Sequence, residues 1–129
     1  MQQADKLKNL TIALYVFGLI YLVGVPVLMM GFEASGWTWT PRQPEYEQMI
    51  MGVYATLGVF LIMAAKNPLE HASLIWFTVW SNIVHGGVML FHSIIDVTER
   101  SNLAGDVPAL FIVAAILWYL MPGQAASQE

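Results

Sequence analysis

The chain has 129 residues, of which 57% are hydrophobic and 11% are charged. Soluble domains carry about 45–50% apolar and about 25% charged residues, so this composition indicates a protein of the lipid bilayer. Nine acidic residues against five lysines and arginines give a net charge of −4, which offers nucleic acid no basic surface and excludes it as an expected partner. The absence of cysteine excludes disulfides, thiolate metal ligands and thiol nucleophiles.

Four continuous apolar segments follow one another along the chain. A helix needs about 20 apolar residues to cross a hydrocarbon core of about 30 Å. The segments are continuous rather than alternating, and unpaired backbone groups are costly in lipid, so they predict helices. We therefore expect an all-α fold, an integral membrane antiparallel four-helix bundle. It would form a single domain over residues 1–129, with spans at residues 10–32, 48–65, 72–95 and 104–121.

Charges between the segments favour one orientation of the chain. Lys6, Lys8 and Lys66 fall on one side of the four spans, and Arg42 and Arg100 fall on the other. Positive residues accumulate on the cytoplasmic side of a membrane, so this count places both termini in the cytoplasm. Trp37 and Trp39, in the longest connection, predict a segment at the level of the lipid headgroups.

The third span gathers polar side chains on one face, which we call the polar seam. Polar groups near the middle of a bilayer are costly and usually face the bundle interior, so the seam predicts the inward face of this helix. At steps of three and four residues it consists of His71, Ile75, Thr78, Asn82, His85, Met89, His92 and Asp96.

The first two spans offer faces that could pack against this seam. On the second span, the Tyr54 hydroxyl could reach Asn82 or His85, and Gly58 would let another helix approach closely. The second-span face is Glu47, Met51, Tyr54, Gly58, Leu61 and Ala65, and the first-span face is Thr11, Tyr15, Gly18, Leu22 and Val25. The predicted intramembrane polar site consists of Tyr54, Thr78, Asn82, His85 and Met89.

The polar residues leave several interpretations open. His85 is either a neutral imidazole satisfied inside the bundle or a proton relay or ligand. His92 and Asp96, four residues apart, could hold a metal ion with Glu47 as a third ligand, or they could form a solvated rim with Asp96 paired to Arg100. Haem needs two axial ligands, usually from facing helices, and the three histidines share one helix, so no cofactor is predicted.

The middle of the chain carries a series of motifs that resemble a family. In order they are Tyr54-x-x-Leu57-Gly58-Val59-Phe60-Leu61, Ala64-Ala65-x-Asn67-Pro68, Ser73-Leu74-Ile75-x-Phe77-Thr78-x-Trp80-Ser81, and then His85 and Met89. This stretch resembles a family of small four-span bacterial membrane proteins described only as a domain of unknown function. The resemblance implies a bacterial inner-membrane protein and carries no activity.

No arrangement of nucleophile, base and orienting acid is visible in the sequence, so catalytic residues are not expected. We expect a non-enzymatic accessory or structural subunit that self-associates as a homo-oligomer or packs on a larger membrane complex. The alternative is a binding or transport protein. Its polar site around Asn82 and His85 would take a cation, a proton or a small apolar ligand such as a quinone. A redox subunit is a third, weaker interpretation.

Overall fold

The structure is a computed structural model that describes residues 2–31 and 44–123. Nearly all of these residues are helical, and none of them forms a β-strand. Helix α1 (Gln3–Leu19) continues through a π-helical turn, η1 (Ile20–Gly24), into α2 (Val25–Gly31). The all-α prediction is confirmed. The later elements are α3 (Pro44–Ala65), the 3₁₀ turn η3 (Pro68–His71), α4 (Ala72–Ile95), the 3₁₀ segment η4 (Val97–Leu103) and α5 (Asp106–Leu120).

Three helical stretches are long and apolar enough to cross a membrane: Gln3–Met29, Glu45–Ala65 and Pro68–Ile95. Helix α5 is apolar but has 15 residues. At 1.5 Å per residue it is about 22 Å long, against a hydrocarbon core of about 30 Å. Helix α5 begins at Asp106, after η4 and a turn, two residues later than the start of the fourth predicted span. Trp37, Trp39 and Arg42 lie outside the described residues.

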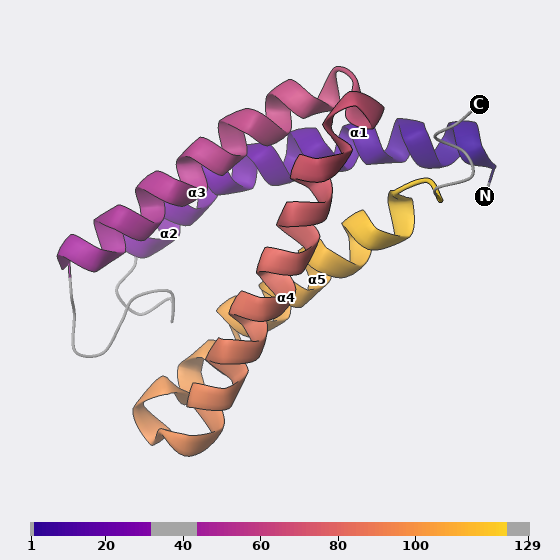
Figure 1. Cartoon of the computed structure of the whole chain (residues 1–129). Coiled ribbons are helices and arrows are strands. Elements are labelled where there is room, and N and C mark those ends of the chain that lie inside the picture. The colour runs from indigo at the N-terminus through magenta and orange to yellow at the C-terminus, as the bar shows by residue number, and fades with distance from the viewer. Residues whose placement is uncertain (1, 32–43, 124–129) are drawn as a thin grey trace.

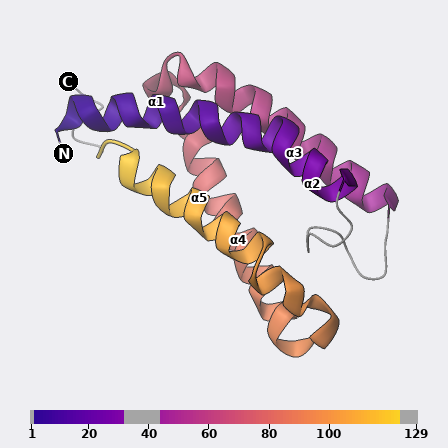
Figure 2. The same ribbon diagram turned by 180° about the vertical axis from the view of Figure 1, so that it is seen from behind.

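The four helical stretches of the predicted antiparallel bundle are arranged as two antiparallel hairpins that diverge from each other. In Figures 1 and 2, α1 and α2 run beside α3, and α4 runs beside α5. The hairpins meet near the connection between α3 and α4 and separate toward η4. At the closed end, Lys6 Nζ lies 4.7 Å from the centroid of the Tyr119 ring. This cation–π contact ties the start of α1 to the end of α5.

Glycines bring the two helices of the first hairpin into backbone contact. A Cβ atom at Gly58 would lie 2.5 Å from the carbonyl oxygen of Gly18, and a Cβ atom at Gly18 would lie 2.8 Å from the carbonyl oxygen of Gly58. Side chains do not fit at either position, so α1 and α3 pack at the small separation that stabilises helix pairs in lipid. The close approach predicted at Gly58 is confirmed.

The second hairpin also has a glycine at its contact. A Cβ atom at Gly86 of α4 would lie 3.2 Å from the ring of Phe111 on α5. This spacing is tight but less restrictive than the contact between Gly18 and Gly58, because a side chain rather than backbone is the neighbour. Each hairpin therefore has a close helix contact at a glycine.

The π-helical turn has a local cause. Pro26 has no backbone N–H, so residue 26 cannot donate the usual helical hydrogen bond to residue 22. The N–H of Val25 bonds to the carbonyl of Ile20, five residues back, which is the π-helical pattern. The buried face of this long helix runs through the turn and comprises Leu10, Leu14, Phe17, Tyr21, Val25 and Met29.

Replacing Gly58 by Ala is expected to lower the free energy of unfolding by about 1–3 kcal/mol, because the new methyl group meets backbone atoms of α1. Gly52→Ala is the matched control on the same helix, since a Cβ atom there meets nothing within 4 Å. Unfolding in detergent micelles, followed by circular dichroism, measures both. Equal stability of the two variants would contradict the close contact of α1 and α3.

Candidate functional site

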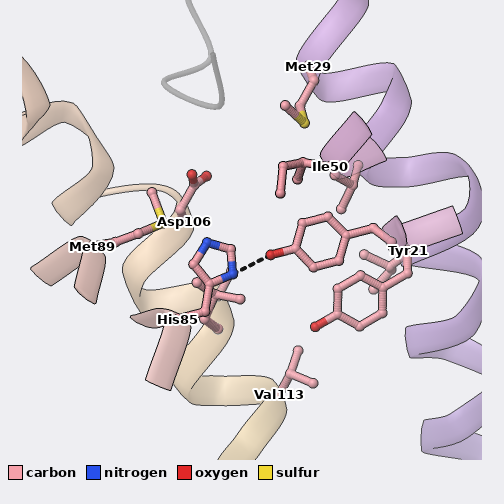
Figure 3. Close-up of a pocket in the computed structure, with 12 residues that line it drawn as sticks. Tyr21, Met29, Ile50, His85, Met89, Asp106 and Val113 are labelled. Atoms are coloured by element: carbon pink, nitrogen blue, oxygen red, sulfur yellow. Dashed lines mark hydrogen bonds between the residues drawn. The ribbon is translucent and has the colours of Figure 1, made fainter. Parts of the chain in front are cut away.

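A pocket of about 90 Å³ lies between the two hairpins and is lined by residues from both of them. Figure 3 shows Tyr21, Met29 and Ile50 of the first hairpin facing His85, Met89, Asp106 and Val113 of the second. The polar or titratable side chains of the lining are Tyr21, Tyr54, His85 and Asp106, and the rest of it is apolar: Ile20, Val25, Met29, Ile50, Met89, Ala109, Leu110 and Val113.

Tyr21 connects the first hairpin to α4 through a buried amide. Its hydroxyl donates to Asn82 Oδ1 over 2.7 Å, and Asn82 Nδ2 donates to the carbonyl of Thr78 over 2.6 Å. The hydroxyl of Thr78 donates to the carbonyl of Leu74 over 2.9 Å. These bonds set the orientation of the amide and satisfy it. Of the residues of the predicted polar site, Thr78 and Asn82 are buried beside the pocket, and Tyr54, His85 and Met89 line it.

Tyr54 makes the second connection between the hairpins. Its hydroxyl is hydrogen-bonded to His85 Nδ1, and the two ring planes are inclined by 10°. The Tyr54 ring also stacks on Tyr21, with centroids 5.3 Å apart and an interplanar angle of 13°. Three rings therefore cross the space between the hairpins in a row. The predicted contact of Tyr54 with His85 is confirmed, and Tyr21 is a site residue that the sequence analysis missed.

Asp106 is the other residue that the sequence analysis missed. It begins α5, and its Oδ1 atom is buried and has no hydrogen-bond partner among the described residues. Buried carboxylate oxygens are almost always paired, so an unpaired one is an unusual feature. A sequence signal existed, because an acidic residue directly before an apolar run can lie at the end of a span. The predicted fourth span, residues 104–121, contains Asp106 without assigning it a role.

The predicted metal ligands do not come together. Glu47 is 2% exposed and lies on α3, whereas His92 and Asp96 are exposed at the end of α4. Within residues 2–31 and 44–123, no group of three or more His, Cys, Asp or Glu side chains could hold a metal ion. Asp96 accepts hydrogen bonds from the hydroxyl and the backbone N–H of Thr98, over 2.7 and 2.9 Å, and these bonds hold the pKa of its carboxyl below the ordinary value.

The polar seam faces the other helices only along its middle part. Ile75, Thr78 and Asn82 are buried and His85 and Met89 are partly buried, but the ends of the seam are exposed. Toward η4 the first hairpin has diverged, so this end of α4 turns its inner face to α5 and η4. Accordingly Ser93 is buried there, and its hydroxyl donates to the carbonyls of Met89 and Glu99 over 2.8 and 3.0 Å.

Comparison with known proteins places the chain in a family. A family model matches residues 4–128. The chain belongs to DUF6632, a family of unknown function. No match was found among curated proteins or among solved structures. The predicted resemblance to an uncharacterised family is confirmed, and the function of this DUF6632 protein has to be argued from its pocket.

Tyr21→Phe and Tyr54→Phe are each expected to lower the free energy of unfolding by about 0.6 kcal/mol and at most about 1.7 kcal/mol. This is the range for one hydrogen bond between helices in a membrane. Tyr15→Phe is the matched control, because the Tyr15 ring is exposed on the same long helix. Detergent unfolding of the three variants checks this. A loss at Tyr15 equal to the losses at Tyr21 and Tyr54 would show that the hydroxyls do not join the hairpins.

Proposed function

We propose that this DUF6632 protein is an integral membrane protein that binds a small molecule between its two hairpins. The molecule would have a largely apolar body and one polar head group. The observation that carries the proposal is the pocket, in which Tyr54, His85 and Asp106 enter an otherwise apolar lining. Ligand sites are typically apolar concavities with a few polar groups that orient the ligand.

The arrangement of the pocket fits binding in a membrane. It lies between helices that are apolar enough to cross a bilayer, and the two hairpins diverge on one side of it. A ligand dissolved in lipid could therefore reach the pocket without passing through water. The chemistry of the lining suits retention of a molecule: the Tyr54 and His85 side chains are hydrogen-bonded to each other and positioned for recognition.

Binding takes precedence here over the accessory role expected from the sequence. A packed structural subunit requires no cavity, whereas a binding protein does. Self-association and packing on a larger complex stay predictions, as does the non-enzymatic character of the chain. The proposed setting is a bacterial inner membrane, which the family resemblance implies. Both ends of the chain would lie in the cytoplasm, because Lys6, Lys8 and Lys66 lie on one side of the spans.

Orientation can be tested directly because the chain has no cysteine. Asn67→Cys would lie in the connection between α3 and α4, and Ser101→Cys in η4 at the opposite end, both at exposed positions. In intact cells, a membrane-impermeant maleimide is expected to label Ser101→Cys, and Asn67→Cys only after permeabilisation. The reverse pattern would overturn the orientation, and recovery of the chain in the soluble fraction would overturn membrane insertion.

Binding can be tested with benzyl alcohol as a probe of neutral charge. In detergent-solubilised protein with ¹³C-labelled methionine methyl groups, the probe is expected to shift the signals of Met29 and Met89 in a saturable way. The signal of Met63, which is exposed on α3, reports non-specific partition of the probe. Saturation at Met29 and Met89 alone supports the site, and equal linear shifts at all three contradict it.

A variant that fills the pocket makes the test specific. Val113 lines the pocket on α5, so Val113→Phe is expected to abolish the saturable shifts by occupying the volume. The neighbouring Ile112 is exposed, so Ile112→Phe adds the same ring outside the pocket and is expected to leave binding unchanged. Circular dichroism confirms that both variants fold. Undiminished binding to Val113→Phe would place the ligand elsewhere.

A further inference from the structure

We propose that the ligand of this pocket is an organic monocation, a protonated amine carried on an apolar body, and that Asp106 selects it. This inference rests on the proposed binding function and names the chemical class of its ligand. It begins from the unpaired Oδ1 atom of Asp106 at the edge of the pocket. Asp106 is partly buried, and its Oδ1 atom lies away from solvent without a partner. That is costly for an ionised carboxylate, and an ammonium group that donates to this atom would remove the cost.

The charges around the pocket favour a positive ligand. Among the described residues that line it there is no lysine or arginine. Arg100, the nearest cationic residue along the chain, is exposed and does not pair with the buried Oδ1 atom of Asp106.

The hydrogen bonds already made inside the pocket leave the Asp106 Oδ1 atom and one ring nitrogen of His85 for a ligand. The Tyr21 hydroxyl proton is donated to Asn82, and the Tyr54 hydroxyl is bonded to His85 Nδ1. The other ring nitrogen of His85 lies on the side of Asp106 (Figure 3). If Nδ1 carries the proton and donates it to the Tyr54 oxygen, Nε2 is a second acceptor for an ammonium N–H, and the Tyr54 O–H is the donor that remains.

The remaining lining suits the apolar part of such a molecule. The rings of Tyr21 and Tyr54 can attract a cation through their faces, an effect that strengthens when the cation is desolvated. Met29 and Met89 have flexible, polarisable side chains that adapt to different shapes. A volume of about 90 Å³ is smaller than the roughly 150 Å³ cavity that holds benzene. The pocket would therefore hold a head group and part of a ring, and the rest of the ligand would extend out of the pocket toward the diverging ends of the hairpins.

Three probes of nearly the same shape separate charge from hydrophobic fit: benzylammonium, benzyl alcohol and benzoate at pH 8. In the full chain, the methionine signals of the pocket are expected to report at least tenfold tighter binding of benzylammonium than of benzyl alcohol. Benzoate is expected to cause no saturable shift, because its charge repels Asp106. A non-ionic detergent keeps the micelle from attracting either ion.

Asp106→Asn is the decisive variant. It is expected to reduce benzylammonium affinity to that of benzyl alcohol, while benzyl alcohol affinity changes less than twofold and thereby shows that the variant folds. Asp96→Asn is the matched control, since it removes an exposed carboxylate outside the pocket, and the preference for benzylammonium should persist in it.

The two proposals fail in different ways. If benzyl alcohol binds at Met29 and Met89 but benzylammonium binds no tighter, or if Asp106→Asn keeps the preference, the cation inference is overturned and the binding function stands. If none of the three probes shifts these signals in a saturable way, the proposed function itself is overturned, and the inference falls with it.

Discussion

Two tyrosine hydroxyls make hydrogen bonds between the two hairpins near the middle of the molecule. Tyr21 and Tyr54 extend from the first hairpin and bond to Asn82 and His85 of α4. Within the first hairpin, Gly18 and Gly58 let backbones touch, whereas between the hairpins the aromatic rings keep the backbones apart. The two tyrosine rings therefore connect the hairpins and also fill part of the space between them. The pocket is the part of this space that the rings do not fill.

The second and third helices were predictable because their polar and small residues are sparse and regularly spaced. The predicted face of residues 47–65 is buried or partly buried in α3, and the bond of Tyr54 to His85 follows from matching depths. The first helix was not predictable in the same way, since it is apolar all round and offers no contrast between faces. Its true inward face includes Tyr21 and excludes Tyr15, which is exposed.

The rest of the site depends on how the two hairpins are placed relative to each other. The spacing of polar and apolar residues along one helix does not predict this placement. The seam pattern continues to His92 and Asp96, but the hairpins have separated at that end, so these residues face outward. Asp106 enters the pocket because α5 starts beside the end of α4 after the 3₁₀ segment. A span boundary derived from hydropathy has no information on that geometry. Thr78 and Asn82 were correctly predicted to be buried. Their side chains donate hydrogen bonds to backbone carbonyls of α4 rather than to a ligand.

In the proposed membrane setting, the length of α5 has a consequence for the lipid around the protein. Its 15 residues leave it about 8 Å shorter than an average hydrocarbon core, judged at 1.5 Å per residue against about 30 Å. Lipids beside α5 would have to compress, or η4 would have to sink toward the acyl chains, and each deformation costs free energy that grows with the mismatch. The mismatch with bilayer thickness would then be confined to the side of the protein formed by α5. Short-chain lipids would lower the free-energy cost of this mismatch, and long-chain lipids would raise it.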